Sequence, residues 1–200
     1  MKYHDLANLV SQPRLDRYLA ACVNSKVKAQ KLYKANLRVA QAFYPLLNLF
    51  EIILRNKIHY RLSAHFANPD WIVVERMGFM SDNSLRGSNF FLKNQIEKAE
   101  RKLRRRGSRI TAGKVIAEQT FGFWTSLFDP HHYRLLRGSI INCFPNKLTT
   151  VNRSEISVKL QRIRDFRNRI YHNEPICFDR NQINFRIAED IKNDIYDLLE

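Results

Sequence analysis

The stretch FYPLLNLFEIIL, residues 43–54, decides the fold class, because its apolar residues return every three or four positions. This period matches the 3.6 residues per turn of an α-helix rather than the alternation of a β-strand. The pattern continues on both sides and predicts one long helix from about Lys26 to Phe66. Pro45 has no backbone N–H to donate, so a kink is expected near it. We therefore expect a long kinked helix at the centre of the fold.

The rest of the chain also predicts helices joined by loops, since it holds only 6 glycines and almost no alternating pattern. Helices are expected over about 12–22, 90–106, 111–128, 133–141 (ended by Pro145), 155–172 and 183–199. Residues 67–89 are rich in turn-forming residues and predict a long irregular insertion, in which WIVV, residues 71–74, is either a short strand or an anchor. The prediction is an all-α bundle in one domain, residues 1–200, with a short N-terminal helix within 1–23.

The charge balance predicts a polyanionic partner. The chain carries 34 Lys and Arg against 19 Asp and Glu, a formal net charge of +15, which exceeds what solubility requires. Nucleic acid is favoured over a membrane, because the longest apolar run is interrupted by Pro45, Asn48 and Glu51. The first residues contain no apolar segment of the kind that a signal peptide carries, so the expected location is the cytoplasm.

Neither the cysteines nor the paired histidines have the spacing of a metal site. Cys22, Cys143 and Cys177 are far apart and have no close Cys or His neighbour, so we expect them to be buried thiols. His131 and His132 likewise have no partners at metal-ligand spacing and are predicted to be a surface pair at the start of a helix. No metal and no cofactor is therefore expected.

The stretch RDFRNRIYHNEP, residues 164–175, carries the chemistry. On a helix, an apolar stripe centred on Ile163 places Arg167 only about 40° from its centre, where an apolar residue is expected. A cation there costs free energy unless it is paired or lines a shared interface. Asn168 and His172 lie one turn apart on a different side of the helix. The members of the stripe are Ile156, Leu160, Ile163, Phe166 and Ile170.

Arg167 and His172 are separated by roughly 140° around the helix axis, too far to hold one phosphate together. An antiparallel helix from a two-fold partner would bring the arginine of one chain to the histidine of the other. We therefore predict a homodimer with a composite active site.

These residue types suit metal-independent cleavage of RNA. Histidine titrates near neutral pH and can move the proton of the 2′-hydroxyl or of the leaving oxygen, while arginine stabilises the charge that develops on the phosphate. Asn168 would orient His172 or hold the phosphate, and the expected products carry a 2′,3′-cyclic phosphate and a 5′-hydroxyl. The structural alternative pairs Arg167 with an acid such as Asp165 or Glu174, and lets His172 complement the helix dipole.

The run RNRIYH, residues 167–172, has the R-N-x-x-x-H form of the HEPN ribonucleases. With NEPI, residues 173–176, it resembles the Abi-like (AbiD/AbiF-type) abortive-infection proteins of bacteria. Other segments fall in that family's order, so the resemblance covers nearly the whole chain: LDRYL (15–19), YKAN (33–36), LFEIILRN (49–56), DW (70–71), VIAE (115–118), FGFW (121–124) and FP (144–145).

The resemblance implies a HEPN-like helical bundle, a homodimer, an RNA substrate and a role as a toxic effector of phage defence. It also implies that Arg167 and His172 are catalytic, with Asn168 beside them. Glu174 stands two positions after the histidine, where HEPN toxins paired with a nucleotidyltransferase antitoxin carry a tyrosine, so regulation by tyrosine modification is not expected. An antitoxin or inhibitor is a further candidate partner.

Two more regions are candidates for RNA binding. On the long helix, Glu51, Arg55 and His59 form a row with Asn56 alongside, which an ordinary Glu–Arg ladder and a second wall of the active-site cleft explain equally well. The run from Lys98 to Arg109 has five cations in positions 101–106, so most are expected to be unpaired and to contact phosphates. The predicted RNA-binding residues are Arg55, Asn56, His59, Arg164, Arg169, Arg101, Arg104 and Arg105.

Two other hypotheses remain open at this point. A catalytically silent HEPN-like module would bind RNA or a protein without cutting. A DNA-binding regulator is disfavoured by the lack of a short helix-turn-helix with a polar recognition helix. The aromatic residues between 121 and 128 are expected in the core rather than stacked on bases.

Overall fold

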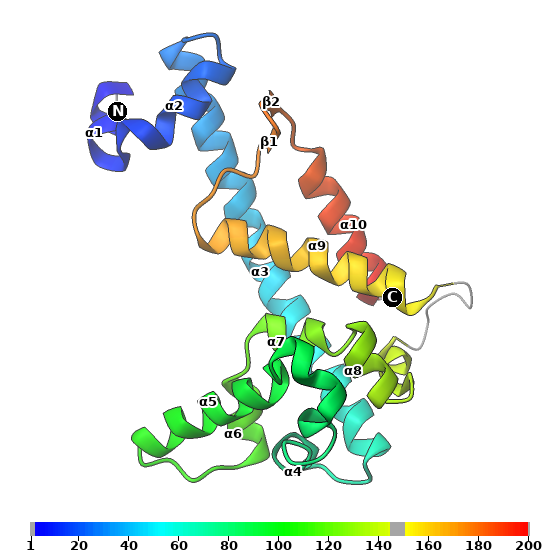
Figure 1. Cartoon of the computed structure of the whole chain (residues 1–200). Helices are drawn as coiled ribbons and strands as arrows, with labels where there is room; N and C mark the ends of the chain where they lie inside the picture. Colours follow the sequence, from blue (N-terminus) through cyan, green and yellow to red (C-terminus); the bar gives the residue numbers. More distant parts are fainter. Residues whose placement is uncertain (1–2, 145–150, 200) are drawn as a thin grey trace. The chain divides into compact units, whose positions relative to one another are not determined.

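The computed structural model describes residues 3–144 and 151–199, and it confirms the all-α class (Figure 1). Its longest element is α3, Lys26–His65, a helix of 40 residues that continues through Pro45. At about 1.5 Å per residue such a helix is roughly 60 Å long. The predicted bounds of this helix were correct to within one residue at its end. Pro145, which was expected to end a helix, lies outside the described residues.

The chain divides into two compact units, each built from separate stretches of sequence. The first unit contains Met1–Asn48 and Asp165–Asp194, and the second contains Leu49–Arg164 and Ile195–Glu200. Three helices contribute residues to both units: α3, α9 (Arg153–Tyr171) and α10 (Arg186–Leu199). The single-domain organisation stays a prediction.

In the first unit, two short helices precede α3 where one was expected. They are α1, Tyr3–Val10, and α2, Gln12–Ala21, separated by Ser11, whose φ of 75° is not helical. The buried ring of Tyr18 packs edge-on against Tyr33 and Phe178, each with ring centroids 5.3 Å apart.

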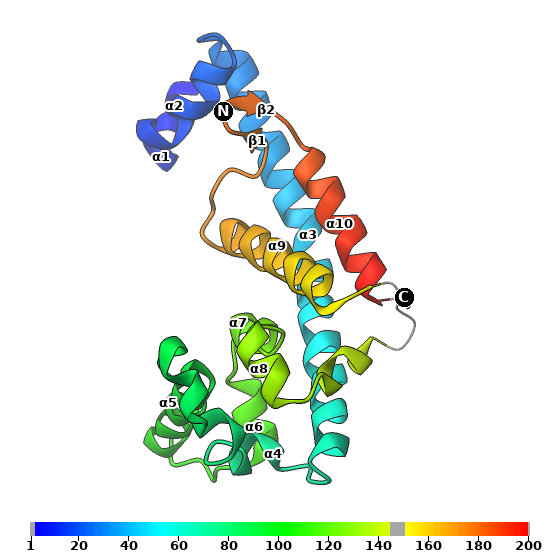
Figure 2. The same cartoon turned by 45° about the vertical axis from the view of Figure 1, so that its right-hand side comes forward.

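A small antiparallel hairpin also belongs to the first unit, although no strand was predicted in this part of the sequence. It pairs β1, Phe178–Asp179, with β2, Gln182–Ile183 (Figure 2). The hairpin occupies the start of the stretch that was expected to form the last helix, so α10 begins only at Arg186. Strands of two residues are too short to show an alternating pattern.

The second unit contains the short helices between α3 and α9. Its elements are α4 (Trp71–Val74), η1 (Phe79–Ser81), η2 (Asn83–Ser88), α5 (Phe91–Arg105), α6 (Ala112–Ala117), α7 (Phe121–Ser126), α8 (Pro130–Leu135) and η3 (Ser139–Cys143). The stretch WIVV is a helical turn rather than a strand, and it is an anchor, since Trp71 and Ile72 are fully buried.

The helix predicted over 111–128 is two helices instead of one. Thr111 caps α6 by accepting a hydrogen bond from the backbone N–H of Lys114 at 3.4 Å. The chain then becomes extended at Thr120, where α7 begins. The prediction that the aromatic side chains of this region belong to the core is confirmed, because Phe121, Phe123, Trp124 and Phe128 are all buried.

One 18-residue window of α3 has the length and composition of a membrane-crossing helix, with a mean hydropathy of 1.3. Of that window, 22% is buried inside the structure. One helix in the described part of the chain meets this criterion, which the core helix of a soluble protein and a signal sequence also meet. The expectation that the protein does not bind a membrane stays a prediction.

Candidate active site

Helix α9 carries the R-N-x-x-x-H motif, and both of its ends are fixed by local sequence. At the start, the Asn152 amide oxygen accepts hydrogen bonds from the backbone N–H groups of Ser154, at 2.8 Å, and Glu155, at 3.2 Å. This is the expected role of asparagine as an N-cap. The predicted apolar stripe is confirmed, because all five of its members are at most 3% exposed: Ile156, Leu160, Ile163, Phe166 and Ile170.

The C-terminal end of α9 is closed by two backbone hydrogen bonds around Asn173, which has a φ of 55°. The N–H of Asn173 donates to the carbonyl of Ile170 at 3.0 Å, and the N–H of Glu174 donates to the carbonyl of Arg169 at 2.8 Å. This pattern is a Schellman motif, and asparagine tolerates the left-handed conformation that it needs. The helix therefore ends at Tyr171 and leaves His172 at its boundary.

The guanidinium of Arg167 is half-buried and lies over an aromatic ring. Its Cζ is 4.1 Å from the ring centroid of Tyr171, one turn further along α9. One of its terminal nitrogens donates to the amide oxygen of Asn168 at 3.4 Å. A cation on an aromatic face is attracted by the negative potential of the ring. Two of the three motif side chains are thus in contact within one chain.

Tyr171 is itself held in place by α3. Its hydroxyl donates to the amide oxygen of Asn48 at 2.6 Å, and its ring lies 5.2 Å from the ring of Tyr44. Tyr171 was not among the predicted site residues. Its position four residues after Arg167 was a usable signal, because residues at i and i+4 share one face of a helix. The contact with Asn48 spans 123 residues and could not be found from local spacing.

His172 is exposed, and its backbone N–H donates to the carbonyl of Asn168 at 2.9 Å. Among the described residues, its imidazole has no hydrogen-bond partner. The ring is therefore accessible to a ligand or to another protein chain. Whether a second chain completes the site, as expected from the helix geometry, stays a prediction.

Two arginines assigned to RNA binding have structural contacts. Arg169 donates a hydrogen bond to the backbone carbonyl of Pro175 and so holds the loop that follows α9. Arg164 belongs to the second unit, where it donates to the hydroxyl oxygen of Thr125 at 3.2 Å. Both side chains are half-buried, so each has a role in the fold whether or not it also contacts RNA.

The predicted RNA-binding residues of α3, which are Arg55, Asn56 and His59, differ in their exposure to solvent. Asn56 is exposed, whereas the Nε of Arg55 is buried and has no hydrogen-bond partner among the described residues. His59 accepts a hydrogen bond at Nδ1 from the indole N–H of Trp71 at 3.2 Å. Burial lowers the pKa of His59, and the nearby Asp70 opposes that shift. His59 therefore helps to anchor α4, and its assignment to RNA binding stays a prediction.

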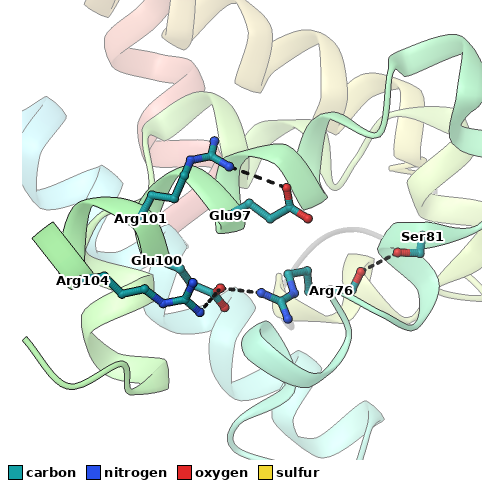
Figure 3. Close-up of polar contacts among 6 residues, drawn as sticks. All are labelled: Arg76, Ser81, Glu97, Glu100, Arg101 and Arg104. Carbon is teal, nitrogen blue, oxygen red and sulfur yellow. Dashed lines mark hydrogen bonds and ion pairs between the residues drawn. The ribbon is translucent and has the colours of Figure 1, made fainter.

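The cations at positions 101–106 are mostly paired, contrary to the expectation from counting charges (Figure 3). Arg101 lies 3.9 Å from Glu97, and Arg104 lies 3.7 Å from Glu100, which Arg76 also contacts. Glu118 of the following segment lies 2.5 Å from Lys102 and 2.7 Å from Arg106, and these cations lower its pKa.

Arg105 is the exception among the cations at positions 101–106, since it is exposed and has no partner in the described part of the chain. The expectation failed because it counted only the acids within the run. Glu118 approaches α5 from a separate helix boundary and could not be assigned to these cations from sequence.

No candidate metal site is found among the titratable side chains of residues 3–144 and 151–199. The described residues contain no group of three or more His, Cys, Asp or Glu that could hold a metal ion. The three cysteines are buried and free, as expected. The prediction that His131 and His132 form a surface pair was wrong for His132, which is 2% exposed and whose Nδ1 lies 2.7 Å from the carbonyl oxygen of Ser126. Burial lowers its pKa.

Known proteins offer no closer guide to this site. No family model, no curated protein and no solved structure matches the chain. The resemblance to the Abi-like HEPN proteins therefore depends on residues 167–176 and on the other segments that follow that family's order.

Proposed function

We propose that the protein is a metal-independent endoribonuclease of the HEPN type, a cytoplasmic effector of phage defence, with Arg167, Asn168 and His172 as its catalytic residues. The observation that carries the proposal is the state of Arg167, a half-buried guanidinium held over Tyr171 at 4.1 Å. A fixed cation, partly shielded from water, is what charge stabilisation on a phosphate requires. An arginine kept only for solubility would be expected to extend into water instead.

The division of roles follows from the two environments. His172, exposed at the end of α9, removes the proton of the 2′-hydroxyl, and the 2′-oxygen attacks the adjacent phosphorus. The bond from phosphorus to the 5′-oxygen breaks, and that oxygen takes a proton from a water molecule as it leaves, while the protonated imidazole returns its proton to solvent. Arg167 stabilises the negative charge on the phosphate during this exchange. The products are a 2′,3′-cyclic phosphate and a 5′-hydroxyl, and no redox partner or metal is needed for the balance.

The proposal includes a homodimer in which Arg167 of one chain and His172 of the other meet at the same phosphate. It is supported by the roughly 140° between the two positions around a single helix. It is also supported by the accessible imidazole of His172, which has no partner among the described residues. RNA is a polyanion, so it is attracted to a chain with a formal net charge of +15.

The experiment is cleavage of labelled RNA by purified wild-type protein and by His172→Ala, with EDTA present throughout. We expect the variant to cut about 10²-fold to 10⁴-fold more slowly while it still binds RNA. Gln182→Ala, an exposed change on β2, is the matched control. Equal cleavage by the His172→Ala variant, or products that carry a 5′-phosphate, would refute the mechanism.

A second function from a different class is a silent module that binds RNA or a protein without cutting it. The observation that favours it is again the imidazole of His172, because no side chain among the described residues orients it for proton transfer. If wild-type protein binds RNA but releases no cut products, the binding module is the better account.

A further inference from the structure

A small pocket in the first unit lies directly beside the motif. It has a volume of about 120 Å³, several times the ~10–15 Å³ that one water molecule needs. Its walls come from α2, α3 and the loop after α9, and they include Ile170 and residues 173–175, on both sides of His172 in the sequence. The catalytic role proposed above uses none of the groups that line it.

Two polar residues that are mostly buried, Asn36 and Tyr33, line this pocket. The Asn36 amide oxygen accepts a hydrogen bond from the backbone N–H of Ile176 at 2.8 Å, which leaves its amide nitrogen unused among the described residues. The hydroxyl of Tyr33 likewise has no hydrogen bond in that part of the chain. These residues are only 4% and 8% exposed, respectively. The amide nitrogen of Asn36 and the hydroxyl of Tyr33 are not among the fully buried atoms without a partner, so both are accessible to solvent and can be reached by a ligand in the pocket.

The rim of the pocket adds groups of a different kind. Gln41 and Glu174 are exposed, and neither side chain has a partner among the described residues. Arg14, also at the rim, donates to the backbone carbonyl of Asn173 at 3.3 Å. The pocket therefore offers amide groups, one carboxylate and one cation around a partly aromatic wall.

The aromatic wall connects the pocket to the proposed catalytic arginine. Tyr44 lines the pocket, its ring lies 5.2 Å from Tyr171, and Tyr171 supports Arg167. A flat ligand lying against Tyr44 would be positioned by the same pair of rings that positions the guanidinium. Stacking on tyrosine together with amide contacts to a planar edge is how proteins bind the bases of single-stranded RNA.

We propose that this pocket binds the base of the nucleotide next to the cleaved phosphate and selects bases that carry an amino group. The inference rests on the proposed nuclease function. Asn36 donates to an acceptor on the base edge, and Glu174 accepts a hydrogen bond from the exocyclic amino group of adenine, cytosine or guanine. Uracil has no amino group, so it leaves the carboxylate unsatisfied and binds less well. Arg14 contacts the adjoining phosphate.

The test measures binding rather than cutting, so that it does not depend on catalysis. Fluorescein-labelled RNA pentamers that differ only in the central base are titrated against the His172→Ala protein. We expect the three amino-bearing pentamers to bind about tenfold tighter than the uracil pentamer. Glu174→Gln, added to the same protein, presents an amide that can both donate and accept, so the discrimination should disappear.

Two further variants separate base recognition from folding. Gln41→Ala changes an exposed side chain and should weaken binding of the amino-bearing pentamers, whereas the control Gln182→Ala should not. Asn36→Asp keeps the acceptor for Ile176 and removes the free donor, and thermal unfolding shows whether that variant is folded. Equal binding of all four pentamers, or a preference for uracil, overturns the proposal, as does discrimination unchanged in the Glu174→Gln and Gln41→Ala variants.

The outcomes distinguish this inference from the nuclease proposal. If the His172→Ala protein discriminates between bases but wild-type protein does not cut RNA, the pocket is supported and the catalytic role fails. If wild-type protein cuts RNA and the pentamers bind equally, the pocket assignment fails alone.

Discussion

Four of the five cations between Arg101 and Arg106, at the end of α5, lie within 3.9 Å of a carboxylate, and Arg167 in α9 lies over a tyrosine ring. Both regions look basic in the sequence, and the run in α5 looks the stronger of the two. The charges in α5 are partly neutralised and mostly exposed, while that of Arg167 is half-buried. The density of charge in a sequence therefore does not show how many of those charges are paired in the folded chain.

The largest effect is expected at Arg167. Replacing it by alanine removes the cation that stabilises the phosphate, so cleavage should fall about 10²-fold to 10³-fold. Arg167→Lys should recover little of this activity, because an ammonium does not reproduce the planar guanidinium that lies over Tyr171. Initial cleavage rates on a labelled RNA test both variants, with Lys34→Ala, an exposed change on α3, as the control. Near-normal cleavage by Arg167→Ala would show that Arg167 does not stabilise the phosphate during cleavage.

Tyr171 should give a smaller, graded effect. Tyr171→Phe keeps the ring under Arg167 and removes only the hydrogen bond to Asn48, so we expect less than a threefold change in cleavage rate. Tyr171→Leu removes the ring face, which contributes roughly 0.5–2 kcal/mol to holding a cation, and should slow cleavage by about tenfold. The measurement is the cleavage rate of each variant. Equal rates would mean that the ring of Tyr171 does not position the guanidinium.

Within α5, a pair of variants tests whether ion pairing matters for RNA binding. Arg105→Ala removes an unpaired cation, so the slope of log affinity against log salt should become shallower by about 0.7 for each phosphate of single-stranded RNA that this arginine neutralises. Arg106→Ala removes a cation that lies 2.7 Å from Glu118 and should change that slope less. Titrations at several salt concentrations give both slopes. Identical slopes for the two variants would mean that the ion pairs open when RNA binds.

The smallest expected effect concerns stability at mildly acidic pH. Burial lowers the pKa values of His59 and His132, so the unfolded chain binds protons more readily than the folded one. Stability should be fully present above about pH 6.5, the ordinary pKa of histidine, and decrease as the pH falls toward the lowered values. Thermal unfolding between pH 7.5 and 5.5 measures this, and His132→Gln should flatten the dependence. A melting temperature that rises on acidification would contradict the lowered pKa values of His59 and His132.

The helices that are long and regular could be predicted from sequence, and the contacts between distant segments could not. The period of apolar residues located α3 and the buried stripe of α9, and Asn173 with Pro175 located the end of α9. The hairpin was missed because two-residue strands have no period. The stretch 111–128 was predicted as one helix because its apolar pattern continues across the break at Thr120.

The candidate site divides in the same way. The half-burial of Arg167 followed from its place beside the apolar stripe, and that part of the prediction agrees with the structure. The ring beneath it, the bond from Tyr171 to Asn48 and the unused amide of Asn36 depend on segments far apart in the chain. The pairing of Glu118 with Lys102 and Arg106 is of the same kind.

The central claim is that Arg167 and His172 act on one phosphate from two different chains, and mixing two inactive variants tests it most directly. Arg167→Ala and His172→Ala proteins are each assayed alone, then mixed in equal amounts, allowed to exchange subunits and assayed again. In a composite dimer, each mixed pair has one intact site, so cleavage should return to about a quarter of the wild-type rate. If the mixture stays as inactive as its components although mixed dimers have formed, the two residues do not act across a dimer, and the account is wrong.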